Sequence, residues 1–206
     1  LEELRKQGYK AFYLAIGCQG GRKANIQGED AEGVMTAVDF LRTVGDNQNY
    51  PVEGRTVVVG GGNVAIDVAR TASRCGASEV SMFCLESREI MPASEEEITE
   101  AQEEGITLNC GWRPKEILTE NGKVKGIVFK KCLSVFDENK RFAPKFDEAV
   151  TMTVPCERVF LSIGQSIVWG NLLEGSKVEL GRGNGAVADK VTYQTAEPDI
   201  FVGGDV

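Results

Sequence analysis

Short apolar runs alternate along this chain with segments of helical periodicity. Apolar runs bounded by glycine or polar residues are typical of buried strands. They occur at Tyr9–Gly17, Arg55–Gly60, Glu79–Leu85, Ile106–Cys110, Arg158–Gly164 and Asp199–Asp205. Because most of these strands are separated by helical segments, the pattern predicts an α/β fold with a Rossmann-like parallel sheet.

Three helices are expected between these strands. The first runs from Asp30, as its N-cap, to about Val44, and Gly45 closes it. The second follows the glycines after the second strand and ends near Gly76. The third begins at the capping box Ser94-x-x-Glu97 and ends at Gly105.

The helical periodicity disappears between Lys115 and Val154. Asn121-Gly122 is typical of a two-residue hairpin turn. Val150, Met152 and Val154 alternate with threonines, which favours a strand with one buried face. We therefore expect an antiparallel β-meander in place of a crossover helix.

A glycine-rich turn joins the second strand to the second helix. The pattern Gly60-x-Gly62-x-x-Ala65 matches G-x-G-x-x-G/A, in which glycines permit a tight turn and let backbone amides approach a pyrophosphate. The strand before it and the helix and strand after it supply the context that the motif requires. A purely structural glycine turn is the alternative. The predicted pyrophosphate contacts are Gly60, Gly61, Gly62, Asn63 and Val64.

The end of the next strand bears on the choice of nucleotide. Glu86 lies 24 residues after Gly62, where an acidic residue usually binds the ribose hydroxyls of NAD and an arginine accommodates the 2′-phosphate of NADP. Ser87 and Arg88 complete this predicted ribose site, and Arg88 favours the phosphate. We favour NADH over NADPH; the alternative is that Glu86 is an ordinary solvated charge.

Composition excludes several function classes. A net charge of −8 argues against nucleic acid and anionic membranes as partners, and no apolar run is long enough to predict a membrane span. Histidine is absent, which removes histidine-based nucleophilic, acid–base and metal chemistry. No metal site and no catalytic side chain are predicted, so the chemistry is expected to come from a bound cofactor.

The six cysteines are scattered and form no C-x-x-C pair. A zinc site or a redox-active dithiol would require closer spacing. We expect small buried thiols in the reducing cytoplasm.

Three further strand ends surround the glycine turn and carry a family resemblance. They are Ala15-Ile16-Gly17, Ser162-Ile163-Gly164-Gln165 and Pro198–Asp205. In this order around GGGNVAID, and with the Met91-Pro92-Ala93 turn, they resemble flavoproteins with two dinucleotide-binding domains. The small (β) subunit of glutamate synthase and its relatives, including the flavin region of dihydropyrimidine dehydrogenase, are similar over essentially all 206 residues.

The resemblance implies an NAD(P)H-dependent FAD oxidoreductase with an inserted nucleotide domain. Residues 32–163 would form the NAD(P)H-binding domain, and residues 1–31 and 164–206 would be parts of a truncated FAD domain. The nicotinamide would extend toward Ile163, Gly164 and Gln165, and Gly204 and Asp205 would contact FAD. Electrons would pass from FAD to iron–sulfur centres or to a partner subunit such as an amidotransferase or synthase.

This sequence departs from the family pattern in several places. The first G-x-G-x-x-G, the cysteine-rich iron–sulfur segment and the C-x-x-C of thioredoxin reductases are absent. Leu85-Glu86 stands where many relatives carry Arg-Arg. The chain does not begin with methionine, so we expect a piece of a longer protein that binds FAD at full length only and is inactive alone.

Two other functions stay open at this stage. One is a nucleotide-binding module without turnover, with a regulatory or structural role. The other is a stand-alone dehydrogenase, which would need a substrate domain and a proton donor such as histidine or a Tyr-x-x-x-Lys pair. Neither donor occurs in the sequence.

Overall fold

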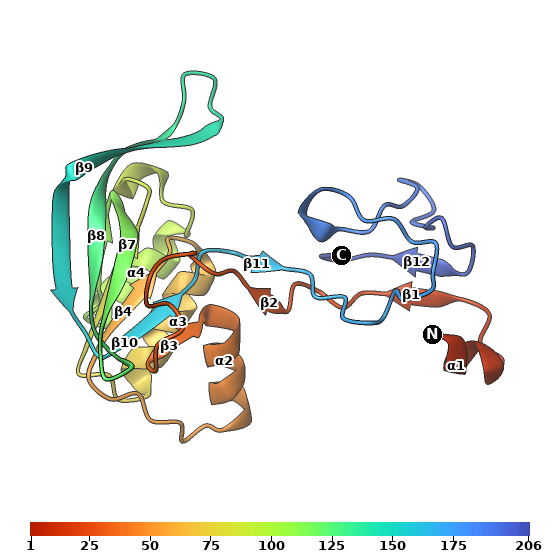
Figure 1. The fold of residues 1–206 in the computed structure, drawn as a ribbon, viewed down its shortest axis with the longest axis horizontal. Coiled ribbons are helices and arrows are strands. Elements are labelled where there is room, and N and C mark those ends of the chain that lie inside the picture. Colours follow the sequence, from red (N-terminus) through yellow and green to blue (C-terminus); the bar gives the residue numbers. More distant parts are fainter. The chain divides into compact units, whose positions relative to one another are not determined.

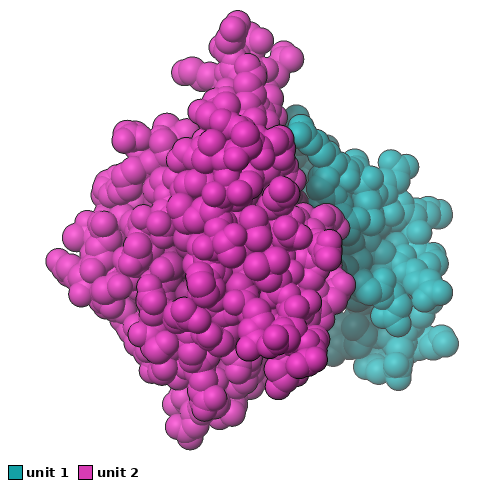
Figure 2. Space-filling model, turned by 60° about the vertical axis from the view of Figure 1, so that its left-hand side comes forward, with its two compact units in different colours: residues 1–20, 165–206 teal, residues 21–164 magenta.

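A computed structural model describes residues 1–206, and the chain divides into two compact units (Figure 2). Unit 1 consists of residues 1–20 and 165–206, and unit 2 of residues 21–164. The chain passes between them through the short strands β2 (Gly20–Gly21) and β11 (Gln165–Ser166), which pair with each other. Residues 21–31, which the sequence assigned to the first segment, belong to unit 2.

Unit 2 is built on a parallel sheet of five strands in the order β3-β10-β4-β5-β6 (Figure 1). The strands are β3 (Val34–Thr36), β4 (Arg55–Val59), β5 (Glu79–Cys84), β6 (Thr107–Cys110) and β10 (Arg158–Leu161). This confirms the predicted α/β fold with a Rossmann-like parallel sheet. The predicted strands at the centre of the sheet are present: β4 and β5 each end one residue before the predicted bound, and β10 ends three residues before it.

Helices pack on one face of this sheet. They are α2 (Ala37–Asp46), α3 (Asn63–Arg74) and α4 (Glu95–Glu103). Val58 and Phe160 point toward these helices, and the Phe160 ring stacks on Phe40 of α2 with centroids 4.0 Å apart. Ser94 is confirmed as the N-cap of α4, because the Glu97 amide donates to the Ser94 hydroxyl at 3.3 Å. The second bond of the predicted capping box is absent, because the Ser94 amide donates to Oδ1 of Asn63 and not to Glu97.

An antiparallel meander packs on the other face and connects β6 to β10. It consists of β7 (Trp112–Glu120), β8 (Lys123–Phe136) and β9 (Phe142–Pro155). Val57, Val59 and Phe83 of the parallel sheet contact its buried side chains. Asn121 and Gly122 have φ values of 52° and 78°, as the predicted hairpin turn requires. Beyond the sheet, β8 and β9 extend as a long hairpin (Figure 1).

The predicted first helix is wrong at both ends. Residues 34–36 form β3, which pairs with β10, and the helix begins only at Ala37. Its N-cap is Thr36, whose hydroxyl accepts from the Asp39 amide, rather than Asp30. Gly45 lies inside the helix, which ends at Asp46. Pairing with a strand more than a hundred residues away outweighs the local helical pattern of Val34.

Unit 1 is a small assembly around two parallel strands, β1 (Phe12–Leu14) and β12 (Ile200–Val202). Their side chains form a core with Ile167 and Trp169. The remaining elements are the helix α1 (Glu2–Lys6) and the 3₁₀ turn η2 (Arg182–Asn184) in unit 1, and the 3₁₀ turn η1 (Arg88–Ile90) in unit 2. No helix in the chain has the length and apolar character needed to cross a membrane.

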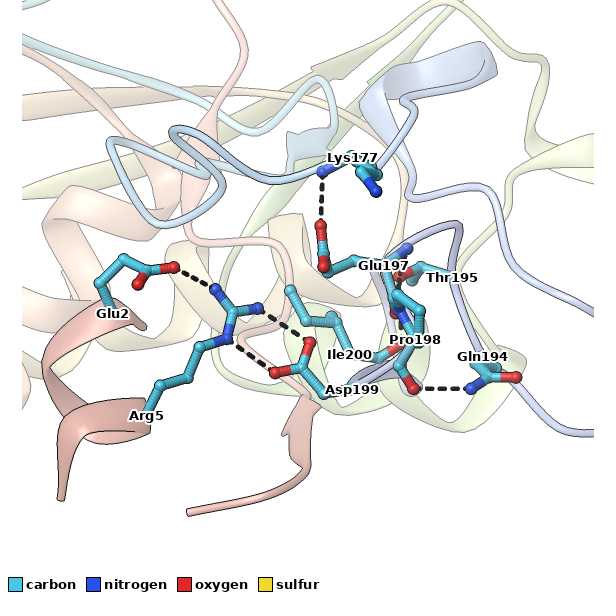
Figure 3. A network of polar contacts seen from close by, with 9 residues as sticks. All are labelled: Glu2, Arg5, Lys177, Gln194, Thr195, Glu197, Pro198, Asp199 and Ile200. Carbon is cyan, nitrogen blue, oxygen red and sulfur yellow. Dashed lines mark hydrogen bonds and ion pairs between the residues drawn. The ribbon is translucent and has the colours of Figure 1, made fainter. Parts of the chain in front are cut away.

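A fork-shaped ion pair ties α1 to the start of β12 (Figure 3). Arg5 donates from Nε and Nη2 to the two carboxylate oxygens of Asp199 at 2.7 and 2.8 Å, and it also bonds Glu2. Beside it, the Thr195 hydroxyl donates to the Ile200 carbonyl at 3.0 Å. These contacts fix the loop that leads into β12.

Truncation of the stacked phenylalanine tests the packing of the helical layer. Phe160 is 1% exposed, so Phe160→Ala should lower the free energy of unfolding by about 3–5 kcal/mol. Phe136→Ala removes a ring of the same size that is 45% exposed, and it should cost much less. Urea unfolding followed by far-UV circular dichroism measures both; equal losses would contradict the layer assignment.

The Arg5–Asp199 pair predicts a dependence of unit 1 stability on pH. Hydrogen bonds from Arg5 lower the pKa of Asp199 below its usual 3.8. The contribution of this ion pair to the stability of unit 1 is therefore complete above the pKa of the carboxyl in the unfolded chain. It is lost as the pH falls through the lower pKa of the folded state. Asp199→Asn should destabilise unit 1 at neutral pH. In this variant the stability of unit 1 should also fall less steeply as the pH is lowered.

Trp169 reports on unit 1, so its fluorescence during urea unfolding, in a Trp112→Phe background, measures this effect. If Asp199→Asn left the acid-side slope unchanged, the ion pair would contribute nothing to stability.

Candidate functional site

The turn after β4 accepts only glycine at its first position. Gly60 has a φ of +148°, and its amide donates to the Phe83 carbonyl of β5 at 2.8 Å. A Cβ atom at Gly60 would lie 2.2 Å from the Ser162 carbonyl oxygen, just after β10. The turn is thus held against the ends of both neighbouring strands.

The next two glycines have different surroundings. A Cβ atom on Gly61 would lie 2.9 Å from Cβ of Cys84 and 3.2 Å from Oε2 of Glu86. At Gly62, by contrast, nothing lies within 4 Å of that position. Gly62 is the N-cap of α3 and no side chain caps this helix. The open side of the turn therefore presents backbone amides at the positive end of the helix dipole, which is suited to a bound anion.

The Met91-Pro92-Ala93 segment braces the turn from outside. The Ala93 amide donates to the Gly61 carbonyl at 3.0 Å, and the Ser94 amide donates to Oδ1 of Asn63 at 2.9 Å. The Asn63 side chain thus positions the N-cap of α4, which leaves the amides of Asn63 and Val64 as the groups that would face a phosphate. Val64 is half-buried against the helical core.

The predicted ribose site lies next to this turn. The Glu86 carboxylate is beside Gly61, and the Glu86 carbonyl accepts from the Gly111 amide at 2.8 Å, which holds the backbone after β5 to the end of β6. Ser87 is exposed at the start of η1. Arg88 donates two hydrogen bonds, of 2.9 and 2.6 Å, to the Glu95 carboxylate and thereby lowers the pKa of Glu95.

A pocket of about 470 Å³ opens beside the predicted ribose site. It lies between the loop after β5, the end of β6 and the C-terminal part of β8. The lining residues are Leu85, Ser87, Arg88, Glu89, Ile90, Cys110, Gly111 and Lys131–Phe136. No local pattern in the sequence indicates the contribution of β8, because the pairing that brings this strand to the pocket is not local.

The residues predicted for the nicotinamide side fall into both units. The Ser162 amide donates to the Val59 carbonyl at 2.7 Å, which places Ile163 and Gly164 next to the glycine turn. Gly164 has a φ of +113°, and its carbonyl accepts from the Arg22 amide at 3.1 Å. The other predicted residues, Gln165, Gly204 and Asp205, are exposed and belong to unit 1.

Comparison with protein families identifies the chain. The sequence model described as "Pyridine nucleotide-disulphide oxidoreductase" matches residues 2–206. The chain belongs to this family. Its resemblance to the glutamate synthase small subunit and related flavoproteins, stated from the motifs, is thereby confirmed.

Two curated relatives match almost the whole of this chain. The NADP(+)-dependent formate dehydrogenase subunit beta of Moorella thermoacetica is 33% identical over 100% of this chain and 29% of its own length. The glutamate synthase [NADPH] small chain of Escherichia coli is 30% identical over 96% of this chain and 45% of its own length. The oxidoreductase chain described here therefore spans less than half of either relative.

Solved structures agree on the fold. Mycobacterium tuberculosis FprA, in a complex with NADPH, has a TM-score of 0.76 and 22% identity, over 98% of this chain and 59% of that one. The thioredoxin reductase of T. acidophilum has a TM-score of 0.71 and 19% identity, over 96% of this chain and 57% of that one. At this identity the likeness extends to the fold alone.

Two glycine substitutions distinguish the roles of the turn positions. Gly60→Ala should destabilise the fold by about 1–3 kcal/mol from backbone strain alone, with a further cost for the clash at Ser162. Gly62→Ala should cost less than about 1 kcal/mol, the loss from alanine at an N-cap, because Gly62 has a φ of −93° and open space around it. Thermal unfolding measures both changes. A stable Gly60→Ala variant would refute the close approach of the turn to β10.

Proposed function

We propose that unit 2 binds a reduced nicotinamide dinucleotide at the glycine turn. The pyrophosphate would lie on the amides of Gly61, Gly62, Asn63 and Val64, with Gly60 setting the turn, and the adenosine ribose at Glu86. The single observation that carries this proposal is the uncapped start of α3 with open space at Gly62. The amides there have no side-chain cap, so a bridging diphosphate can accept from them.

The nicotinamide end would extend toward the turn after β10. Ile163 and Gly164 lie next to Gly60 through the Ser162 contacts, so the backbone there can approach a flat ring. Gln165 is proposed as a further contact of the nicotinamide, and Gly204 and Asp205 as contacts of FAD, from the family resemblance. We further propose that residues 32–163 are the NAD(P)H-binding domain and that both flanking segments belong to an FAD domain.

NADH is the proposed nucleotide rather than NADPH. The Glu86 carboxylate beside the turn can accept hydrogen bonds from ribose hydroxyls, and it would repel a 2′-phosphate. Arg88, which could attract that phosphate, is held by Glu95 in a two-bond pair. Relatives such as the Escherichia coli glutamate synthase small chain are named for NADPH, so this preference would set the present chain apart.

In the full-length protein, the nucleotide would supply a hydride that FAD accepts and passes on as electrons. The chain's own residues would bind and orient the nucleotide and keep water away, which is what transfer between two cofactors needs most. No side-chain acid or base is required, in line with the absence of histidine. The relatives named as subunits of formate dehydrogenase and glutamate synthase support a partner subunit as the destination. Iron–sulfur centres are proposed from the family resemblance alone.

Calorimetric titration of this chain with NADH, NADPH and FAD tests the proposal. We expect binding of NADH, weaker binding of NADPH and little binding of FAD. If neither NADH nor NADPH bound, the proposed function would be overturned. NADH binding without flavin reduction in the full-length protein would instead favour a regulatory nucleotide-binding module.

Charge reversal at the ribose site tests nucleotide choice. Glu86→Arg should shift the ratio of NADPH to NADH affinity toward NADPH by about tenfold or more, which corresponds to about 1.4 kcal/mol. Glu79→Arg is the matched control, because Glu79 is exposed at the opposite end of the same strand. It makes the same charge change and should leave the ratio unaltered. An unchanged ratio in Glu86→Arg would remove Glu86 from the site.

A further inference from the structure

Two cysteines that are far apart in sequence meet at the end of the parallel sheet. Cys84 and Cys110 are the last residues of β5 and β6, and they are direct partners in the register of these strands. Partners in a parallel pair point to the same face of a sheet, and neighbouring strands lie about 4.7–4.9 Å apart. Disulfides form between residues whose Cα atoms are about 4.4–6.8 Å apart. The backbone spacing here is thus within the range that a disulfide needs.

The two thiols differ in their access to solvent. Cys84 is 5% exposed, and its Sγ lies 3.5 Å from the position of a Cβ on Gly61. Cys110 is half-buried and lines the 470 Å³ pocket. Burial and the neighbouring Cys110 thiol both raise the pKa of Cys84. A thiol that lines a pocket, beside a buried one, is an arrangement in which the first reacts with a reagent and the second resolves the product.

The Cys84 thiol also contacts the predicted ribose site. Its S–H donates to the Glu86 carbonyl at 3.6 Å, and the same carbonyl accepts from the Gly111 amide, next to Cys110. The backbone that carries Glu86 is therefore bound to both cysteine-bearing strand ends. A covalent bond between the sulfurs would remove the S–H donor and draw Cys84 away from Gly61.

We propose that Cys84 and Cys110 form an oxidisable dithiol that controls nucleotide binding. The Cys110 thiolate attacks one sulfur of a low-molecular-weight disulfide and releases the first thiol. The Cys84 sulfur, after losing its proton to solvent, attacks Cys110 and releases the second thiol. Two protein thiols are oxidised to one disulfide and the reagent is reduced to two thiols. Lower affinity for the dinucleotide follows, a consequence that rests on the function proposed above.

Oxidised glutathione added to this chain tests the covalent step. Alkylation and peptide mass mapping should show one internal disulfide joining Cys84 to Cys110, reversible by dithiothreitol. Cys84→Ser and Cys110→Ser should each abolish it. Cys75→Ser should keep it, because Cys75 is a half-buried cysteine in neither strand. Glutathione held on Cys110 without an internal bond, or a disulfide between other cysteines, would overturn the proposal.

Affinity measurements on the reduced and oxidised chain test the consequence. NADH should bind the oxidised form about tenfold more weakly. In Cys110→Ser the affinities before and after glutathione treatment should be equal. Formation of the Cys84–Cys110 bond without loss of affinity would refute the control of binding. Failure of the reduced chain to bind nucleotide would refute the proposed function, while the mass map would still decide whether the thiol pair exists.

Discussion

The packing of one glycine turn between two strand ends determines the geometry of unit 2. At Gly60 the backbone approaches the Ser162 carbonyl so closely that a side chain would overlap it, and the Gly60 amide bonds the Phe83 carbonyl on the other side. Both contacts come from strands that flank β4 in the sheet. Because the turn is fixed from both sides, α3 begins without a side-chain cap and beside open space at Gly62.

The layers on either side of the sheet hold this turn in place. Val58 and Phe160 fill the helical face, and Val57, Val59 and Phe83 fill the face under the meander. The meander replaces a helix and also brings β8 beside the end of β6, where the pocket forms. The meander therefore both completes the core and lines the pocket next to the predicted ribose site.

Features with a local physical cause were predictable from the sequence. The glycine turn, the Ser94 cap and the Asn121-Gly122 hairpin each depend on a few neighbouring residues, and all three are present in the structure. The helix expected from Asp30 was wrong because Val34 belongs to a strand that pairs with β10. The roles of Asn63 and Arg88 likewise depend on partners supplied by another segment, namely Ser94 and Glu95.

The proximity of Cys84 and Cys110 likewise depends on the pairing of two separate strands and could not be predicted from the sequence. Their spacing along the chain matches no metal or redox motif, and only the register of β5 and β6 brings them together. The sequence thus predicts which residues can bind a dinucleotide, whereas the pairing of strands determines what surrounds them.

Amide chemical shifts recorded by NMR during an NADH titration show whether the dinucleotide binds at the glycine turn. We expect the largest changes on the amides of Gly61, Gly62, Asn63 and Val64, with smaller changes near Glu86. Saturation with NADH while those four amides keep their shifts would show that the dinucleotide does not bind at this turn.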